Sequence, residues 1–172
     1  MAQDKEKIII EVEDLEVAAE KKNMVRVLVF ALGAEYYCIE IKQAKEVLAL
    51  PEITRIPNRV PFITGVINLR GEIIALIDLR YFFSLEQRER NEQSRVIVTD
   101  ISGSLTGILV DKVEDTIDID EKLIQAPLAT LPEKVLAYTK GHVQLENRIL
   151  ILLDLEKVLH SEEVEALRKT GG

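Results

Sequence analysis

The stretch GVINLRGEIIALIDLRYFFSLEQ, residues 65–87, returns without a gap as GHVQLENRILILLDLEKVLHSEE, residues 141–163. Upstream, residues 26–46 match residues 95–115 in the same way, but there the two segments are 69 residues apart instead of 76. An insertion of seven residues within the acidic segment EDTIDIDEKLIQ of the second copy accounts for the difference. The sequence therefore predicts two copies of one unit, at about residues 25–86 and 94–160.

Each copy consists of short runs of Val, Ile and Leu that are separated by Gly, Asn and Pro, a pattern typical of short β-strands. A unit of this length has a marginal core of its own, so we expect the two copies to pack against each other. A sheet of about five short strands removes its exposed edges by curling into a barrel. We predict a mainly β fold with two small barrels, short helices and a groove between the barrels. The pattern leaves open whether the barrels exchange strands.

The segments outside the two copies have a different character. Residues 1–23 are acidic with a brief apolar run, and we interpret them as an N-terminal tail or short helix. Residues 161–172 are predicted to extend the last helix and to end in a tail with two terminal glycines. The domain that carries the function is expected to span residues 24–160.

Composition limits the possible functions. The chain has 47% hydrophobic residues and a net charge of −8, which disfavours nucleic acid and anionic membranes as partners. The longest aliphatic runs, such as residues 73–77 and 149–153, are far shorter than the about 20 residues of a membrane-spanning helix. We find no export signal, and we expect a cytoplasmic protein. The single cysteine, Cys38, is expected to be a buried thiol.

Motifs for catalysis or metal binding are missing from the sequence. It has no phosphate-binding loop and no Gly-X-Ser-X-Gly motif, and His142 and His160 stand apart from each other. Asp78 and Asp154 each follow an aliphatic strand and precede a run with helical spacing, where a carboxylate accepts hydrogen bonds from free amides. We interpret both as helix caps, and we expect no catalytic residue, metal or cofactor. A hydrolase that uses Asp78 or Asp154 is the rival interpretation.

The hairpin turn of the first copy differs from that of the second. Gly71 and Asn147 are the residue types that best tolerate a positive φ, so we expect both in tight turns. Arg70 is different, because Glu146 with the opposite charge occupies its place in the second copy. Arg70 is therefore either a solvated cation in a weak ion pair with Glu46 or Glu72, or a contact to a partner.

Four apolar residues occupy the first hairpin of each copy or the segment that follows it: Leu28, Ile41, Ala44 and Val113. They are either part of the core or part of a protein-binding patch at the junction of the barrels.

The segments FALGAEYYCIEIKQAKEVL, TRIP, GVINLRGEIIALIDLR and GILVDKVEDTI, in this order, resemble the CheW family of bacterial chemotaxis coupling proteins. The resemblance covers about residues 25–160. It implies two SH3-like five-stranded β-barrels around a shared apolar centre, in agreement with the duplication. It also implies a non-enzymatic scaffold without a cofactor, which bridges methyl-accepting chemoreceptors and the histidine kinase CheA. Such a protein would be cytoplasmic and associated with membrane-anchored receptor arrays.

The resemblance also implies roles for individual residues. Leu28, Ile41, Ala44 and Val113 look like the groove that takes the helical tip of the receptor. Asn68, Arg70 and Glu46 match positions associated with coupling, and they could face either the receptor or the kinase. Family members often have a branched aliphatic residue in place of Ala44, so the groove here could be shallower.

Two alternatives to this function stay open. The first is a CheW-like scaffold of a non-flagellar chemosensory pathway. The second, of a different class, is a nucleic-acid-binding protein with small barrels, which the negative charge and the eight aromatic residues disfavour.

Overall fold

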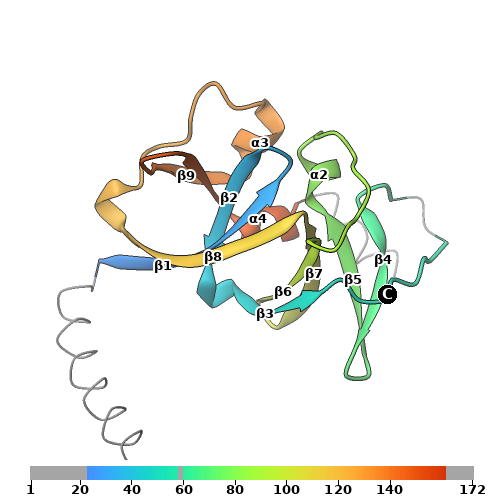
Figure 1. The fold of residues 1–172 in the computed structure, drawn as a ribbon. Coiled ribbons are helices and arrows are strands. Elements are labelled where there is room, and N and C mark those ends of the chain that lie inside the picture. The colour runs from blue at the N-terminus through green and yellow to red at the C-terminus, as the bar shows by residue number, and fades with distance from the viewer. Residues whose placement is uncertain (1–22, 58–59, 162–172) are drawn as a thin grey trace, which may run out of the picture.

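The computed structural model describes residues 23–57 and 60–161, and the strands of this part form two five-stranded sheets. Sheet A contains β1 (Met24–Leu32), β2 (Glu35–Glu40), β8 (Lys112–Asp120), β9 (Thr139–Gln144) and β10 (Ile149–Leu153), in the order β8-β1-β2-β10-β9. Sheet B contains β3 (Ala44–Ala49), β4 (Ile63–Leu69), β5 (Glu72–Asp78), β6 (Arg95–Ile101) and β7 (Ser104–Val110), in the order β3-β6-β7-β5-β4. The two sheets lie side by side (Figure 1).

The helices of the described residues are short. They are η1 (Ile41–Gln43), α2 (Leu79–Phe82), η2 (Glu121–Leu123), α3 (Glu133–Ala137) and α4 (Leu155–Leu159). Helices α2 and α4 follow β5 and β10, which are equivalent strands of the two copies. The prediction of a mainly β fold with short helices is confirmed.

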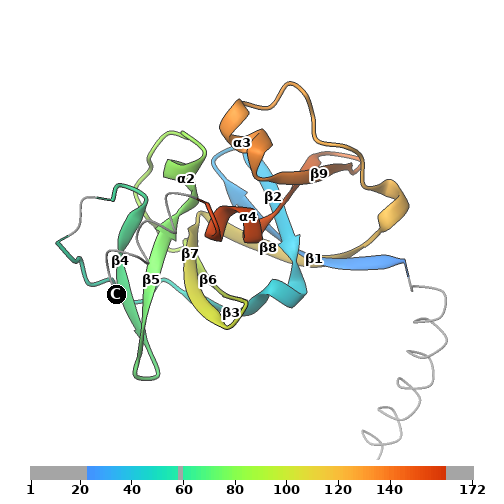
Figure 2. The ribbon, with the colours of Figure 1, turned by 180° about the vertical axis from the view of Figure 1, so that it is seen from behind.

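Strands are exchanged between the two copies. Under the duplication, β1, β2, β3, β4 and β5 correspond to β6, β7, β8, β9 and β10, and the two sheets have the same strand order in these terms. Sheet A nevertheless combines β1 and β2 of the first copy with β8, β9 and β10 of the second. The chain leaves sheet A through η1 and returns to it at Asp111, between β7 and β8. Sheet B is thus continuous in sequence, whereas sheet A joins the two ends of the domain (Figure 2).

A pair of hydrogen bonds closes each sheet into a barrel. Beyond the end of β3, Thr54 exchanges two backbone hydrogen bonds of 2.9 Å with Val66 of β4, which is the other edge of sheet B. Gln125, beyond β8, pairs in the same way with His142 of β9, at 2.9 and 3.0 Å. Closure leaves each barrel without an open edge where these residues pair. We refer to the closed sheets as barrel A and barrel B.

Three apolar clusters form the core. Strand β1 contributes to two of these clusters, because successive side chains of a strand point to opposite faces. Val27 and Val29 face the interior of barrel A, while Leu28 and Phe30 face a cluster shared by both barrels. The interior of barrel B is a third cluster, with residues of β4, β5, β6 and β7. The shared cluster also takes residues from α2, α3 and α4, so the barrels pack as the small size of each copy predicts.

Cys38 lies in the interior of barrel A and has no disulfide partner. Burial raises the pKa of its thiol to about 12. The expectation of a buried thiol is confirmed.

The expectations for residues 1–23 and 161–172 fall, except for Asn23 and Ser161, on residues that lie outside the described part of the chain. Within residues 23–57 and 60–161, no helix has the length and apolar character needed to cross a bilayer.

Candidate protein-interaction site

The turn between β4 and β5 places Arg70 in an unusual backbone conformation. β4 ends at Leu69 and β5 begins at Glu72, and these two residues are paired, so the loop has only two residues. Arg70 has φ 52° and Gly71 has φ 87°, which is the pattern of a type I′ turn. Gly71 adopts this conformation without strain, but an arginine has a cost of about 1 kcal/mol in the left-handed region. Turn geometry therefore explains Gly71 and disfavours Arg70.

The hairpin turn of the second copy has a different backbone geometry at Asn147. Its φ is not positive, because the described non-glycine residues with positive φ are Arg70, Ser84 and Ser102. β9 ends at Gln144 and β10 begins at Ile149, but the N–H of Leu145 donates a hydrogen bond of 2.8 Å to the carbonyl oxygen of Arg148, so Glu146 and Asn147 form the turn. This turn therefore closes without a left-handed residue at Glu146 or Asn147.

Arg70 forms an ion pair with Glu46 of β3. The Nη1–Oε2 distance is 2.9 Å and the Nη2–Oε1 distance is 3.3 Å, so the contact has two hydrogen bonds. The side chain of Arg70 is 74% exposed and that of Glu46 is 22% exposed. Solvent screens such a pair, and its net contribution to stability is below about 1 kcal/mol. Of the two carboxylates considered from the sequence, the structure places Glu46 against the guanidinium group.

Asn68 supports the turn from within. Its side-chain Oδ1 accepts a hydrogen bond of 2.9 Å from the backbone N–H of Gly71. Opposite Asn68 in the ladder lies Ile73, which is 63% exposed although it is a large aliphatic residue. We call Glu46, Asn68, Arg70 and Ile73 the Arg70 surface. It lies on the β4–β5 hairpin, which projects from barrel B, and on the adjacent β3 (Figure 1).

Ile73 was missed in the sequence because it stands in a run of aliphatic residues that reads as a buried strand. The available signal was its position directly after Glu72, at the exposed end of the hairpin.

The four residues expected to form a groove lie around one apolar cluster at the junction of the barrels. Leu28 is 4% exposed and belongs to the shared core, while Ile41, Ala44 and Val113 are partly buried and pack against the same core. They come from β1, η1, β3 and β8. The structure thus brings the four together, with Leu28 beneath the surface and the other three reaching it.

Asp78 and Asp154 have the contacts of helix caps. The carboxylate of Asp78 accepts a hydrogen bond of 2.9 Å from the backbone N–H of Arg80, and that of Asp154 accepts one of 3.2 Å from Lys157. Burial raises the pKa of Asp78, against the opposing effects of this hydrogen bond and of the Arg80 charge. Among residues 23–57 and 60–161, no three His, Cys, Asp or Glu side chains gather as a metal site would require.

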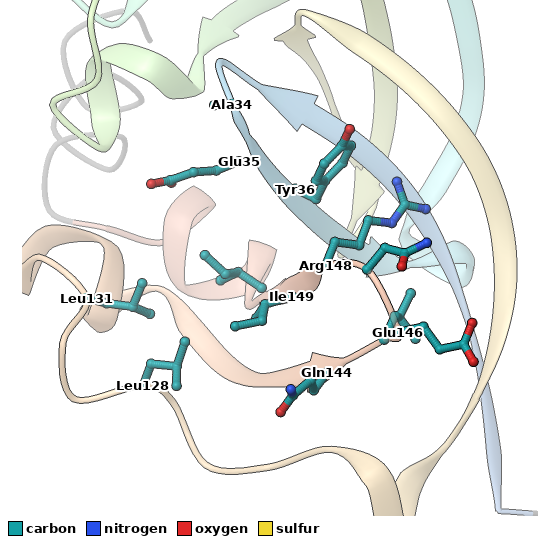
Figure 3. A pocket seen from close by; sticks show the side chains of 12 residues that line it. Ala34, Glu35, Tyr36, Leu128, Leu131, Gln144, Glu146, Arg148 and Ile149 are labelled. Atoms are coloured by element: carbon teal, nitrogen blue, oxygen red, sulfur yellow. The ribbon is translucent and has the colours of Figure 1, made fainter.

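A cavity of about 610 Å³ lies at the β9–β10 hairpin of barrel A, on the counterpart of the hairpin that carries Arg70 (Figure 3). Leu128, Leu131 and Ile149 form an apolar part of its lining. On another part of the lining the guanidinium carbon of Arg148 lies 4.5 Å from the centroid of the Tyr36 ring, as in a cation–π contact. No motif in the sequence predicted this cavity, because its residues come from three separate segments.

Comparison with known proteins gives consistent matches over this domain. A family model described as a CheW-like domain matches residues 26–163. The chain is 38% identical over 137 residues to the chemotaxis protein CheW of Klebsiella aerogenes, which covers 80% of this chain and 82% of that protein. A crystal structure of the scaffolding protein CheW from Thermoanaerobacter tengcongensis matches with a TM-score of 0.73 and 33% identity, over 81% of this chain and 94% of that chain.

A shorter match is found to the protein PilI of Pseudomonas aeruginosa. It is 30% identical over 84 residues, which is 49% of this chain and 47% of that protein.

Proposed function

The chain belongs to the CheW-like family of chemotaxis scaffold proteins, and on this basis we propose that it couples methyl-accepting chemoreceptors to the histidine kinase CheA. It acts as a non-enzymatic adaptor in the cytoplasm, within arrays of membrane-anchored receptors. It needs no cofactor, because its role is to hold two partners in a fixed relation.

The observation that carries this proposal is the position of Arg70. Its left-handed backbone has a cost of about 1 kcal/mol, and its exposed ion pair with Glu46 contributes less than about 1 kcal/mol. The two effects nearly cancel, so stability gives no reason for an arginine at this place. A strained, exposed cation on a projecting turn is better explained by contact with a partner.

The chemistry of the Arg70 surface suits a protein partner. It combines the exposed apolar side chain of Ile73 with Arg70, whose guanidinium group is a frequent anchor in interfaces. Glu46 holds the guanidinium in place before the partner arrives, which reduces the entropy lost on binding. Asn68 acts through the turn by fixing Gly71 beside it.

The second contact is the junction of the barrels. Ile41, Ala44 and Val113 take the apolar face of the receptor's helical tip, with Leu28 as the packed layer below. With one partner at the junction and another on the Arg70 surface, a change in the receptor alters kinase activity through different contacts in its two states.

Reconstitution tests the proposal. Membrane vesicles that contain a chemoreceptor are mixed with CheA, and the kinase that sediments with them is measured as this protein is added. For an adaptor with two sites, the amount of sedimented kinase passes through a maximum. Excess adaptor occupies receptor and kinase on separate molecules, and the bridge between them is lost. If the protein binds neither partner at tens of micromolar, the proposal is wrong.

The second candidate is a coupling role in a non-flagellar chemosensory pathway, which the partial similarity to PilI favours. The same sedimentation assay with receptors and kinases of the different pathways of the host cell separates the two candidates. Nucleic acid is a poor partner for a chain with a net charge of −8.

A further inference from the structure

Arg80 is a buried cation between the two barrels. It belongs to α2, which follows β5 of barrel B, and it is 5% exposed. Its Nη1 donates a hydrogen bond of 3.0 Å to the carbonyl oxygen of Glu86, and its Nη2 forms an ion pair with Asp111. A buried charge is strongly destabilising when its partner is removed, so this contact holds its two elements firmly together.

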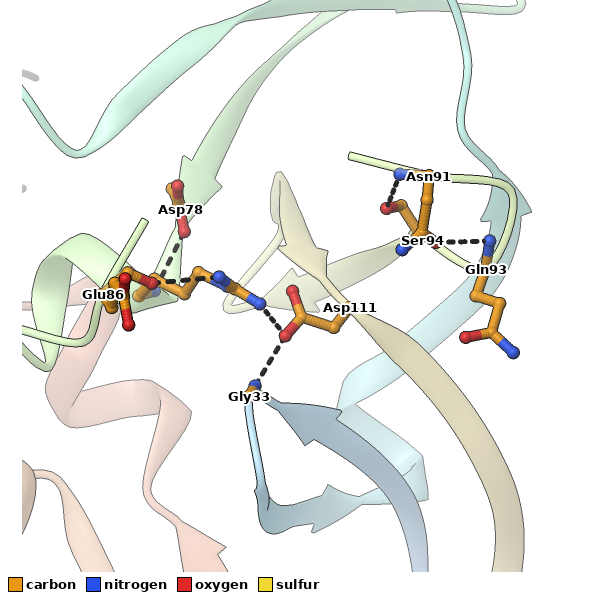
Figure 4. Close-up of polar contacts among 8 residues, drawn as sticks. Gly33, Asp78, Glu86, Asn91, Gln93, Ser94 and Asp111 are labelled. Atoms are coloured by element: carbon orange, nitrogen blue, oxygen red, sulfur yellow. Dashed lines mark hydrogen bonds and ion pairs between the residues drawn. The ribbon is translucent and has the colours of Figure 1, made fainter. Parts of the chain in front are cut away.

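Asp111 is the residue at which the chain returns from barrel B to barrel A. Its carboxylate also accepts a hydrogen bond of 2.6 Å from the N–H of Gly33, in the β1–β2 turn of barrel A. Its own N–H donates a hydrogen bond of 3.1 Å to the carbonyl oxygen of Ala31. Figure 4 shows Gly33 and Asp111 on one side of this network and Asp78 and Glu86 on the other. The Arg80–Asp111 pair therefore connects α2 of barrel B to two segments of barrel A.

The other crossing between the barrels, at η1, is built differently. Under the duplication Asp111 corresponds to Lys42 and Arg80 to Glu156, and both of these residues are exposed. The buried residue here is Gln43, which is 7% exposed. The Oε1 atom of Gln43 is buried and has no hydrogen-bond partner. Among the described residues, no other buried side-chain oxygen or nitrogen is in this state. A buried acceptor in this state is destabilising, so a movement that hydrates or pairs it recovers part of that free energy.

We propose that the Arg80–Asp111 pair is a fixed pivot between the barrels, and that the η1 crossing is the side on which they move apart. The two crossings lie toward opposite ends of β1, since Asp111 bonds Ala31 whereas η1 follows Glu40, which pairs with Val27. Ala31 and Val27 are four residues apart in β1, which corresponds to about 13 Å along the strand. A small rotation at the pivot is thus amplified at η1.

If the proposed function holds, the pivot takes part in coupling. We assign Ile41 and Ala44 to the receptor contact. Ile41 is the first residue of η1, and Ala44 directly follows Gln43, its last residue. A receptor tip that binds there acts on the movable side and changes the angle between the barrels. The pivot itself is tested on the isolated chain, so its failure is distinct from failure of the adaptor role.

The test measures the distance between the barrels by pulsed electron spin resonance. Spin labels are placed at Ile73→Cys in barrel B and Ile149→Cys in barrel A, two exposed and equivalent positions, while Cys38 is buried. We expect a narrow distance distribution in the parent protein and a broader one after Arg80→Met or Asp111→Asn. The control is Arg26→Met, which removes the exposed ion pair with Asp118 within barrel A and leaves the distribution unchanged.

Gln43→Leu tests the other side, because it removes the unpaired acceptor. We expect a higher urea midpoint and a distribution no broader than that of the parent. The proposal is overturned if folded Arg80→Met and Asp111→Asn proteins keep the narrow distribution, or if Gln43→Leu broadens it as much as they do.

Hydrogen exchange of the unaltered protein decides the question if both pivot variants fail to fold. The amides of Gly33 and Asp111 bond within the pivot, whereas that of Ala44 bonds to the carbonyl oxygen of Ile41 at the end of η1. We expect at least tenfold slower exchange at the pivot amides. Equal rates, or faster exchange at the pivot, contradict the proposal.

Discussion

Two glycines explain, at the scale of single residues, how each barrel closes. A Cβ atom on Gly65 would lie 2.5 Å from the carbonyl oxygen of Thr54, and one on Gly141 would lie 2.4 Å from that of Gln125. Both contacts are with backbone atoms of the closing pairs, so only glycine lets the strands approach. The recurrence of glycine at these two positions of the repeat is therefore a consequence of barrel closure.

Substitution of these glycines is expected to be severe. Gly65→Ala and Gly141→Ala should each lower the free energy of unfolding by more than about 2 kcal/mol, because the closing pair must separate. Gly103→Ala is the control, since its φ of 81° strains alanine but no atom lies within 4 Å of the added Cβ. Its expected cost is about 1 kcal/mol. Equal losses for the three variants in urea unfolding would show that closure is not what requires glycine.

Cys38 gives the stability a dependence on alkaline pH. Burial raises the pKa of its thiol from the ordinary value of 9.0 to about 12. The folded state thus favours the protonated thiol. The resulting contribution to the free energy of unfolding is complete below pH 9 and is lost as the pH rises toward 12. The loss amounts to about 1.4 kcal/mol per pH unit in this window.

The measurement is the free energy of unfolding of the parent and of Cys38→Ala at pH 8 and 10.5. The parent should lose more stability between these values, although Cys38→Ala starts lower because of its cavity. Burial also raises the pKa of Tyr37, but this effect is common to both proteins and cancels in the comparison. Parallel pH profiles would contradict the assignment to Cys38.

At the scale of elements, the two equivalent hairpins differ where the sequence suggested similarity. Aligned Gly71 and Asn147 both tolerate a positive φ, but of the two only Gly71 adopts one. Residue preference predicts which conformations are allowed. Which of them is adopted depends on the tertiary packing of the hairpin, which a short segment does not encode.

Asn68 is the residue that distinguishes the first hairpin. Asn68→Ala removes the acceptor of the Gly71 N–H, and we expect a loss of about 1 kcal/mol together with faster hydrogen exchange at Gly71. Asn147→Ala in the other hairpin serves as the control and should stay within about 0.5 kcal/mol of the parent. A loss as large in the control would mean that the side-chain bond of Asn68 is not what stabilises the turn.

At the scale of the whole molecule, the duplication in the sequence was sufficient to predict the fold class, the two barrels and their shared core. It was not sufficient to predict which strands pair. Exchanged and unexchanged barrels place the same apolar residues inside, so the hydrophobic pattern is identical for both. In the same way, Leu28, Ile41, Ala44 and Val113 could be recognised as apolar, but only the structure shows that Leu28 belongs to the buried layer.

Strand exchange has a testable consequence for fragments of the chain. Residues 1–88 hold only two strands of barrel A, and residues 89–172 hold only two strands of barrel B. We expect each fragment alone to be unfolded by circular dichroism and the mixture to recover the β-sheet signal of the intact chain. An equimolar mixture of either fragment with bovine serum albumin is the control. Independent folding of either fragment would contradict the exchanged topology.

The central claim is that Arg70 is retained for a partner and not for stability. The most direct measurement compares Arg70→Ala with Arg26→Ala in the reconstitution of receptor vesicles and CheA. Both variants remove an exposed arginine that contacts a carboxylate at 2.8–2.9 Å, the first in barrel B and the second in barrel A. We predict that each changes the free energy of unfolding by less than about 1 kcal/mol, and that only Arg70→Ala reduces the sedimented kinase, by at least tenfold. Equal kinase recovery with the two variants, or a large loss of stability in Arg70→Ala, would contradict the claim.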